Sequence, residues 1–470
     1  MSRAPFDVAV IGAGAAGMMV AAVAGQRGLR VVLIDHAKRL AEKIRISGGG
    51  RCNFTNLGAG PAQFLSRNPD FCRSALRGYG PQDFLDLLRK HGVSWHEKHR
   101  GQLFCDDSSE SIIQLLQREC QQGQVAWRMP CTVQAVRREA AIFVLDTDSG
   151  PIHAAQVVLA TGGMAIPQLG ATDFSLRIAR QFGLKIVEPR PALVPLTFDT
   201  AHWQPYAALS GVALEVCLSH EVRPGAKDVA LLPSEDSSSA AAQDGKAAGR
   251  RSQANRKRRR GPARTEFLED LLFTHRGLSG PGILQISSYW QPGDPIRVDL
   301  APGQAMGEAL VAAKSGSRQT LLTALSAIWP RRLAEAWLAQ SDAAWAGKAA
   351  AAGGAGSGAD AAGNLGSLRL ADVSDRNLRA LGEGIHGWTL WPTGTAGYKK
   401  AEVMRGGVDT AELDQRSLQA QRCPGLYVIG EAVDVTGWLG GYNFQWAWAS
   451  GVACGRALVS GAVQAKKTLR

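Results

Sequence analysis

The N-terminal residues contain the pattern that most constrains what this chain folds into. Residues 6–11 are apolar and predict a buried strand, and residues 18–27 have the small side chains of a closely packed helix. Between them, Gly12-Ala13-Gly14-Ala15-Ala16-Gly17 matches the G-x-G-x-x-G turn. A second apolar strand, residues 30–34, ends at Asp35, so the region predicts a βαβ unit and a parallel sheet.

Each glycine has its own physical role in such a turn. Gly12 permits the sharp change of direction, and Gly14 lets the backbone approach a pyrophosphate. Gly17 lets the helix pack closely on the strand, and the helix N-terminus offers free N–H groups to phosphates. Asp35 stands 18 residues after Gly17, where a carboxylate accepts hydrogen bonds from an adenosine ribose. The pattern therefore predicts a dinucleotide without a 2′-phosphate, but it does not separate NAD from FAD.

The rest of the chain predicts an α/β fold with inserted units. A buried strand at 156–160 ends in Thr161-Gly162-Gly163, and a strand at 425–429 with a helix at 441–459 indicates that the first sheet is resumed at the C-terminus. Short alternating strands and a helical stretch lie between these parts. We expect a Rossmann-type nucleotide-binding domain in residues 1–191 and 413–470, a β-barrel-like insertion in 192–302 and 384–412, and a small helical domain in 303–383.

Two segments have compositions that do not form a packed core. Residues 234–264 are rich in Ser and Ala and then in Arg and Lys, and residues 346–366 are mostly Ala and Gly. Neither stretch buries enough apolar surface to offset its ordering entropy, so we predict a disordered basic insertion and an Ala/Gly linker. The first also accounts for most of the charge, because removing the nine Lys and Arg residues of 246–264 lowers the net charge from +12 to +3.

The composition is that of a soluble globular protein, and the sequence argues against a secreted, membrane or metal-binding protein. Residues 8–25 lack a charge, but three glycines interrupt them and Asp7 precedes them, so a buried strand, turn and helix explain the stretch better than a membrane span. The eight cysteines are scattered without a CxxC pair or zinc spacing. We therefore expect free thiols, no metal site and a cytoplasmic location.

Four further stretches carry a resemblance to a known family. Residues 43–56 read KIRISGGGRCNFTN, residues 430–447 read GEAVDVTGWLGGYNFQWA, and residues 273–281 read FTHRGLSGP. These stretches resemble signatures of one flavoprotein family, often called BaiN-like or YhiN-like. Residues 101–107, GQLFCDD, are similar to the YhiN subgroup in particular. The resemblance spans most of the chain except the two low-complexity insertions.

The resemblance implies FAD and a glutathione-reductase-like Rossmann domain with an inserted β-barrel and a small helical domain. Residues 47–53 would place consecutive backbone N–H groups near phosphates and flavin, and the glycines that open the last helix would place its positive end near the flavin N1–C2=O. The cofactor-binding residues expected from the turn and the resemblance are Gly12, Gly14, Ala15, Gly17, Asp35, Lys43, Ser47, Gly48, Gly49, Gly50, Arg51, Asn53, Thr161, Gly162, Gly163, Gly430, Glu431, Gly440, Gly441, Tyr442 and Asn443.

Members of the YhiN subgroup are linked to reduction of a uridine of large-subunit (23S) ribosomal RNA to dihydrouridine. In that hypothesis, hydride passes from a transiently docked NAD(P)H to FAD and then to uracil C6, and a protein acid protonates C5. The acid candidates in the resembling stretches are Cys52, Cys105 and His275, each of which also fits a purely structural role. We interpret the other cysteines as packing residues, namely Cys72, Cys120, Cys131, Cys217, Cys423 and Cys454.

The partner and the reaction stay open at this level. The basic run 246–264 fits ribosomal RNA or its precursor, because arginine-rich segments contact phosphates, although a solvated linker has the same composition. Trp388, Trp391, Lys399 and Lys400 fit base stacking and phosphate contact, or equally a barrel core and a solvated surface. The alternatives are a small-molecule flavin oxidase or reductase, and a binding protein with structural FAD that the basic segment tethers to RNA.

Overall fold

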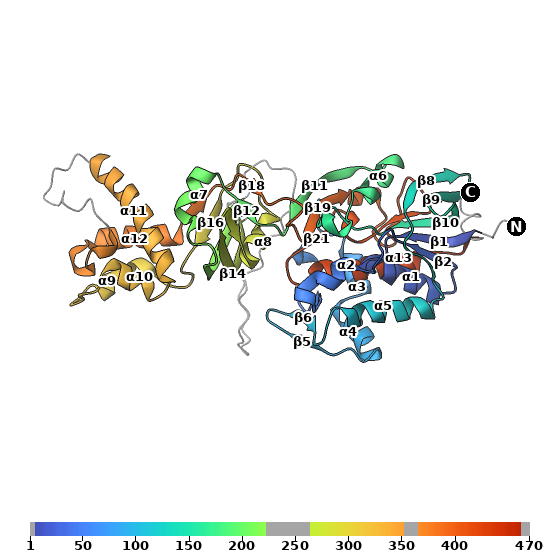
Figure 1. Cartoon of the computed structure of the whole chain (residues 1–470), viewed down its shortest axis with the longest axis horizontal. Helices are drawn as coiled ribbons and strands as arrows, with labels where there is room; N and C mark the ends of the chain where they lie inside the picture. Colours follow the sequence, from blue (N-terminus) through green and yellow to red (C-terminus); the bar gives the residue numbers. More distant parts are fainter. Residues whose placement is uncertain (1–4, 222–263, 352–364, 462–470) are drawn as a thin grey trace, which may run out of the picture.

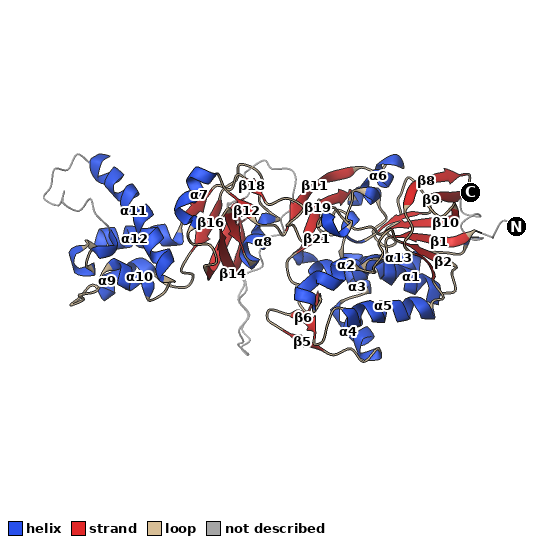
Figure 2. Ribbon diagram, viewed as in Figure 1, coloured by secondary structure: helices blue, strands red, loops and turns tan. Residues whose placement is uncertain are grey.

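The computed structural model describes residues 5–221, 264–351 and 365–461 of the chain. These residues form three groups of elements along the long axis of the molecule (Figure 1). A large α/β body lies at one end, an antiparallel sheet lies in the middle, and a group of helices lies at the other end. Figure 2 shows that both the large body and the middle group contain strands, whereas the far group is helical.

The large body is built on a seven-stranded sheet with the order β7-β2-β1-β10-β9-β8, in which β20 also pairs with β10. Its strands are β1 (Phe6–Ile11), β2 (Val31–Ile34), β7 (Ala126–Arg128), β8 (Val133–Glu139), β9 (Ile142–Thr147), β10 (Ile152–Leu159) and β20 (Leu426–Val428). The pairings among β7, β2, β1, β10 and β20 are parallel, whereas β8 and β9 add an antiparallel edge. The predicted parallel sheet, and its completion by a C-terminal strand, are therefore confirmed.

Three helices cover this sheet and hold the two chain ends together. Helix α1 (Ala15–Gln26) packs against both α5 (Glu110–Gln122) and α13 (Tyr442–Ala457). Small residues allow this close approach: a Cβ on Gly451 of α13 would lie 2.9 Å from the carbonyl oxygen of Ala16. Helix α13 is buried along most of its length, so the last helix belongs to the core that β1 begins.

The remaining elements of the body bring distant segments beside the sheet. They are α2 (Glu42–Ile46), η1 (Ser47–Gly50), β3 (Asn53–Asn56), η2 (Pro61–Gln63), β4 (Phe64–Leu65), α3 (Arg73–Gly78), α4 (Pro81–Lys90), β5 (Trp95–Glu97), β6 (Gln102–Cys105), η3 (Pro167–Leu169), α6 (Phe174–Gln181), β11 (Ile186–Ala192), β19 (Val403–Val408), η6 (Thr410–Glu412), η7 (Gly430–Ala432) and β21 (Thr436–Gly437). Strands β3, β6 and β5 form one small sheet, β11 pairs with β19, and β4 pairs with β21.

The middle and far groups share a second hydrophobic core. The middle group is an antiparallel sheet with the order β17-β16-β13-β14-β15-β12-β18. Its elements are β12 (Leu196–Thr197), α7 (Thr200–Ala207), β13 (Ala213–Glu221), β14 (Arg264–Thr274), β15 (Gly277–Ser279), α8 (Pro281–Ser287), β16 (Ile296–Asp299), β17 (Trp388–Leu390) and β18 (Gly394–Thr395). The far group consists of α9 (Met306–Ala313), α10 (Leu321–Ser326), α11 (Arg331–Ala351), η4 (Leu365–Ser367), η5 (Leu370–Asp372) and α12 (Asp375–His386).

Two predicted segment boundaries change. The segment 384–412 does not belong wholly to the antiparallel sheet, because β17 and β18 join that sheet while β19 pairs with β11 of the large body. Residues 346–351, which were predicted as the start of the Ala/Gly linker, belong instead to α11, because alanine is a strong helix former and the helix continues to Ala351. Residues 222–263, with almost all of the predicted basic insertion, and residues 352–364 lie outside the described part of the chain.

Candidate cofactor and active site

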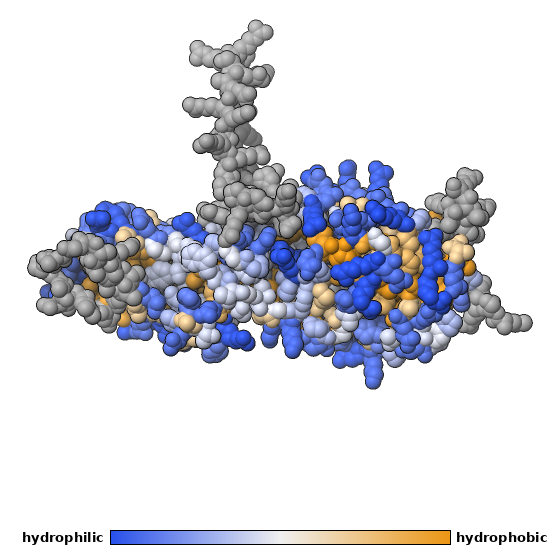
Figure 3. Space-filling view, turned by 90° about the horizontal axis from the view of Figure 1, so that it is seen from above, coloured by the Kyte–Doolittle hydropathy of each residue, from blue (hydrophilic) through white to orange (hydrophobic). Residues whose placement is uncertain are grey.

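A cavity of about 880 Å³ opens in the large body at the carboxyl ends of the parallel strands. Gly12 after β1, Asp35 after β2 and Ala160 after β10 all line it. This edge is where open α/β sheets bind ligands, and the volume lies within the range of about 300–1,000 Å³ that ligand pockets occupy. The space-filling view shows an apolar area on the large body bordered by hydrophilic side chains (Figure 3). A cavity of this size and place suits a dinucleotide.

The three glycines of the first turn differ in their surroundings. Gly12 has φ +106°, and a Cβ there would lie 2.5 Å from the carbonyl oxygen of Ala160. A Cβ on Gly17 would lie 1.8 Å from the carbonyl oxygen of Gly12, so this glycine joins helix to turn. Gly14 lines the cavity, and a Cβ on it would meet no atom within 4 Å. The open side of Gly14 is the place where a pyrophosphate could approach the backbone.

The Asp35 carboxylate is held in part by the glycine-rich turn at residues 12–17. One of its carboxylate oxygens accepts a hydrogen bond of 2.6 Å from the backbone N–H of Ala13, and the other accepts one of 2.8 Å from that of Ala37. Both bonds orient the carboxylate while it lines the cavity. The remaining acceptor capacity of the two oxygens is available to a ribose.

A glycine triplet forms the wall that follows α2. Gly48, Gly49 and Gly50 have φ of +57°, +67° and +88°, a run of left-handed residues that favours glycine at each position. A Cβ on Gly48 would also lie 2.8 Å from the backbone nitrogen of Asn53. Ser47, Gly48, Gly49 and Asn53 line the cavity. The turn thus presents backbone rather than bulky side chains to a ligand.

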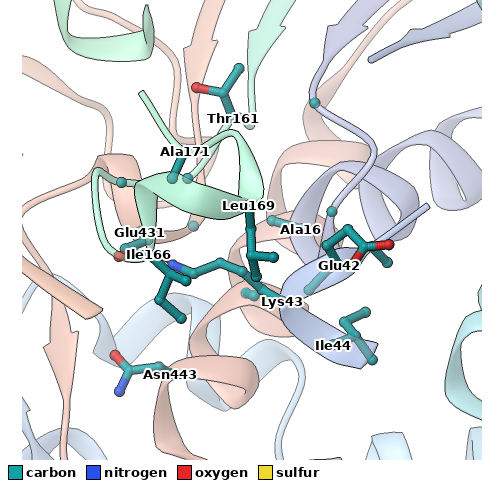
Figure 4. Close-up of a pocket in the computed structure, with 18 of the residues that line it drawn as sticks. Ala16, Glu42, Lys43, Ile44, Thr161, Ile166, Leu169, Ala171, Glu431 and Asn443 are labelled. Atoms are coloured by element: carbon teal, nitrogen blue, oxygen red, sulfur yellow. Dashed lines mark hydrogen bonds and ion pairs between the residues drawn. The ribbon is translucent and has the colours of Figure 1, made fainter. Parts of the chain in front are cut away.

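An ion pair joins this region to the C-terminal part of the chain. The Lys43 Nζ of α2 lies 2.6 Å from Glu431 Oε2, and the backbone N–H of Met404 donates to Glu431 Oε1 over 2.9 Å. Figure 4 shows the Lys43 side chain extending toward Glu431, with Ile166 and Leu169 drawn close to it in the same view. Both oxygens of Glu431 are therefore held, and the ammonium of Lys43 is set at the cavity surface.

The N-terminus of α13 forms another part of the wall. Gly440 and Gly441 have φ of +107° and +94°, and a Cβ on Gly441 would lie 2.3 Å from the carbonyl oxygen of Thr55. The side chain of Asn443 accepts a hydrogen bond from the N–H of Gly437 and donates one to its carbonyl oxygen. These contacts fix the start of a 16-residue helix beside the cavity, where its free N–H groups and positive dipole end favour a negative charge.

Most of the predicted cofactor residues line this one cavity. They are Gly12, Gly14, Ala15, Asp35, Lys43, Ser47, Gly48, Gly49, Asn53, Thr161, Gly162, Gly163, Gly430, Glu431, Gly440, Gly441 and Asn443. Gly17, Gly50, Arg51 and Tyr442 are outside its lining. Gly17 serves the helix–turn contact, the side chain of Arg51 is exposed, and Tyr442 packs edge to face against Phe64.

The structure does not bring the predicted acids Cys52, Cys105 and His275 into the cavity lining. Both thiols are fully buried, and this burial raises the pKa of Cys105 to about 12 and also raises that of Cys52. Such thiols hold their protons too tightly to be good acids near neutral pH. His275 is exposed in the turn between β14 and β15.

The other cysteines mostly match the packing role that was predicted. All eight cysteines are free, as expected. Cys217 departs from the pattern because it is only half-buried on β13, and Cys131 departs from it because it lines the cavity. The described residues contain no group of three or more His, Cys, Asp and Glu side chains that could hold a metal ion.

Sequence reasoning missed Glu402, a further carboxylate in the cavity wall. It stands just before β19, and its backbone N–H donates to the carbonyl oxygen of Leu193 over 3.1 Å. Surrounding protein raises its pKa from 4.5 to about 6, and the nearby Lys43 partly offsets that rise. The segment Lys-Lys-Ala-Glu around it has no distinctive pattern, so only the pairing of β11 with β19 reveals its position.

The candidate RNA contacts separate into two kinds. Trp388 is half-buried in the second core, where its ring lies 5.3 Å from that of Tyr206 and 5.5 Å from that of Trp337. Trp391 is 61% exposed, and Lys399 and Lys400 are also exposed. Trp388 therefore has the core role, and the other three residues belong to the surface.

The loop of Lys399 and Lys400 lies at the cavity. The backbone N–H of Ile166, which lines the cavity, donates to the carbonyl oxygen of Tyr398 over 2.9 Å, and Gln168 donates to that of Lys399 over 3.2 Å. The two lysines thus stand next to a lining segment.

In the described part of the chain, no helix combines the length and the apolar character that crossing a membrane requires.

Comparisons with known proteins cover nearly the whole chain. Residues 6–457 match the family described as HI0933-like protein Rossmann domain. The chain is 41% identical to the ribosomal RNA dihydrouridine synthase of Escherichia coli (strain K12), over 97% of this chain and 98% of that protein. It is 38% identical to the protein of the same name from Haemophilus influenzae, over 95% and 96%. It is also 28% identical to the 3-dehydro-bile acid delta(4,6)-reductase of Clostridium scindens, over 96% and 98%.

Proposed function

The chain belongs to the HI0933-like family of FAD-dependent oxidoreductases, and on this premise we propose that it reduces a uridine of 23S ribosomal RNA to dihydrouridine. The observation that carries the proposal is the near full-length similarity, at 41% and 38% identity, to two proteins named ribosomal RNA dihydrouridine synthase. The cavity supports the proposal, because its walls unite the dinucleotide turn with residues of three of the four family-like stretches, 43–56, 101–107 and 430–447. NAD(P)H is the proposed electron donor.

The residues of the cavity fit FAD. The open side of Gly14 and the N-terminus of α1 would receive the pyrophosphate, and Asp35 would bind the adenosine ribose. The pair Lys43–Glu431 would bind the ribityl hydroxyls. The positive end of α13, at Gly441, would stabilise negative charge on the reduced flavin.

Bound FAD supplies a two-electron carrier that takes hydride from a dihydronicotinamide and gives it to uracil C6. The chain's own contribution is to bind and orient the two partners and to manage the proton that C5 requires. The aromatic and apolar side chains of Phe104, Trp438 and Leu439 line the cavity and would limit water around the reacting base.

Access for an RNA base is proposed along the loop that borders the cavity. Lys399 and Lys400 would contact phosphates beside the target nucleotide, and the exposed ring of Trp391 would stack on an unpaired base. A uridine must leave its stack to reach a flavin, so phosphate contacts of the two lysines beside the cavity would help to hold the displaced strand.

The experiment is a reconstituted reaction under anaerobic conditions. The purified flavoprotein is mixed with NADH or NADPH and with 23S ribosomal RNA that lacks the modification, and the RNA is digested and examined by mass spectrometry. We expect the flavin to bleach with the nicotinamide and one uridine to gain two hydrogens. Bleaching without any dihydrouridine would contradict the RNA substrate but not the oxidoreductase.

A second candidate is reduction of a small α,β-unsaturated ketone. The observation that favours it is the similarity over 96% of this chain to a 3-dehydro-bile acid delta(4,6)-reductase. Both names describe reduction of a carbon–carbon double bond, so the same cavity chemistry would serve either substrate. Turnover of steroid enones by the reduced protein, with no change in ribosomal RNA, would select this candidate.

A further inference from the structure

One acidic side chain in the cavity differs from all the others. The carboxylates that line the cavity are Asp35, Glu42, Asp173, Glu402 and Glu431. Four of them have partners: Asp35 accepts two backbone hydrogen bonds, Glu431 is held by Lys43 and Met404, Glu42 faces Arg39 and Arg45, and Asp173 pairs with Arg177. Among the described residues, the Glu402 side chain makes no hydrogen bond or ion pair.

The position of Glu402 is nevertheless fixed. Its backbone is tied to Leu193 just before β19 pairs with β11, and its neighbours Ala401 and Val403 are buried. The exposed surface of its side chain borders the cavity rather than another protein group. The fold thus holds a carboxyl group at the cavity surface and leaves its oxygens free for a ligand.

The electrostatic surroundings of Glu402 suit proton donation. Surrounding protein raises its pKa to about 6, and Lys43 is the charged group that counteracts this rise. The other charged or titratable groups that line the cavity are Asp35, His36, Arg39, Glu42, Cys131, Asp173, Arg177 and Glu431. A ligand that fills the cavity would remove water from Glu402 and raise its pKa further, which brings it close to the ideal for an acid at neutral pH.

We infer that Glu402 is the catalytic acid of this site, a carboxylic acid that donates its proton to the substrate carbon adjacent to the one that receives hydride. This inference rests on the proposed function and names a residue for it. Hydride from the reduced flavin forms a C–H bond at C6, and the C5=C6 double bond opens. Its electron pair takes the proton of Glu402 at C5. The substrate gains two electrons and two hydrogens, and the carboxylate recovers its proton from water.

The principal variant is Glu402→Gln, which keeps the size and polarity of the side chain but cannot donate an acidic proton. General acids contribute about 10²- to 10⁴-fold to rate, so we expect uridine reduction to fall by at least about 100-fold. Bleaching of the flavin by NAD(P)H should continue, because hydride transfer from nicotinamide to flavin does not use this proton. Glu402→Asp should recover part of the lost rate.

Two readouts do not depend on turnover. We expect FAD to bind Glu402→Gln and wild type with equal affinity, measured by titration of the apoprotein. The visible spectrum of bound oxidised flavin should change with pH in the wild type, with an apparent pKa at or above about 6, as the neighbouring carboxyl ionises. Glu402→Gln should lack this transition. The matched control is Glu188→Gln, because Glu188 is an exposed carboxylate on β11 outside the cavity lining.

The outcomes separate the inference from the function on which it rests. An active wild type with an equally active Glu402→Gln variant would overturn the inference and keep the function. Loss of FAD binding in Glu402→Gln would make Glu402 a cofactor-holding residue and would also overturn it. A wild type that bleaches but never reduces uridine would overturn the proposed function and the inference together. A selective loss of uridine reduction, with FAD binding intact and the spectral transition abolished, would support both.

Discussion

The cavity has two kinds of wall, and they differ in how the chain builds them. The local wall consists of Gly12–Ala16 and Asp35, which come from one βαβ unit. The assembled wall consists of Lys43, Ser47–Gly49, Glu402, Glu431, Gly440, Gly441 and Asn443, which come from far apart in the sequence. Its central ion pair joins residues that are 388 positions apart.

The two walls offer different chemical groups to a ligand. The local wall offers mainly backbone atoms, so it suits any dinucleotide and selects little beyond that class. The assembled wall offers an ammonium, a free carboxyl group and a helix N-terminus, which are the groups that would distinguish a flavin and act on a substrate. The cofactor class is therefore a local property of this chain, and the chemistry is a property of the whole fold.

The largest expected effect comes from two glycines of the local wall. Gly17→Val should prevent folding, because even its Cβ would lie 1.8 Å from the Gly12 carbonyl oxygen. Gly14→Val should leave the fold intact, because that side of Gly14 is open, but it should weaken FAD binding by at least about 100-fold, or about 2.7 kcal/mol. Circular dichroism and FAD titration measure the two effects. Equal damage from both substitutions would break the distinction between a packing glycine and a ligand-facing glycine.

A smaller effect is expected where the assembled wall is tied together. Lys43→Met should weaken FAD binding about tenfold, because it removes the partner of Glu431 and leaves that carboxylate poorly paired. A double-mutant cycle with Glu431→Gln should give a coupling energy of about 1 kcal/mol. Additive effects of the two substitutions on FAD affinity would show that the pair does not act as a unit.

The same division explains what the sequence could predict. The turn at Gly12, the strand that ends at Asp35 and the C-terminal helix follow local patterns, so their places in the fold were predictable. Glu402 was not, because the pairing of β19 with β11 alone brings it to the cavity. The boundary predicted at 384–412 was misplaced for the same reason. The sequence of a short strand such as β19 does not indicate which sheet the strand joins. Cys52 and Cys105 stand in cofactor-like stretches yet point into the core, which composition does not reveal.

A few-fold effect on RNA binding is expected from Lys399 and Lys400, the exposed lysines beside the cavity. Replacing Lys399 and Lys400 together with Gln should weaken binding of a 23S fragment and reduce the slope of log affinity against log salt by about 1.4, since each phosphate contact in single-stranded RNA contributes about 0.7. The charge-matched control replaces Arg331 and Arg332 of α11, at the far end of the molecule (Figure 1). Equal salt slopes for both double variants would contradict a specific role of Lys399 and Lys400 in RNA binding.

The smallest expected effect is a pH-dependent change in stability of the apoprotein. The pKa of Glu402 is raised from 4.5 to about 6 in the folded protein. Between these pH values the folded state binds the proton more tightly than the unfolded state does, so the free energy of unfolding falls as pH rises through this interval. Above about pH 6 the cost of the charged carboxylate is fully present. Glu402→Gln should therefore match wild type in Tm below pH 4.5 and show a small increase at pH 8. A difference that is largest in acid would mean that the carboxylate stabilises the fold.

The central claim is that the two walls together make a flavin site that reduces uridine in ribosomal RNA. The most direct measurement is a map of dihydrouridine in 23S ribosomal RNA from cells without this gene, complemented with wild type or with Gly14→Val. We predict that one dihydrouridine disappears on deletion, returns with the wild-type chain and does not return with the variant. Identical maps in all four strains, including the parent, would contradict the account.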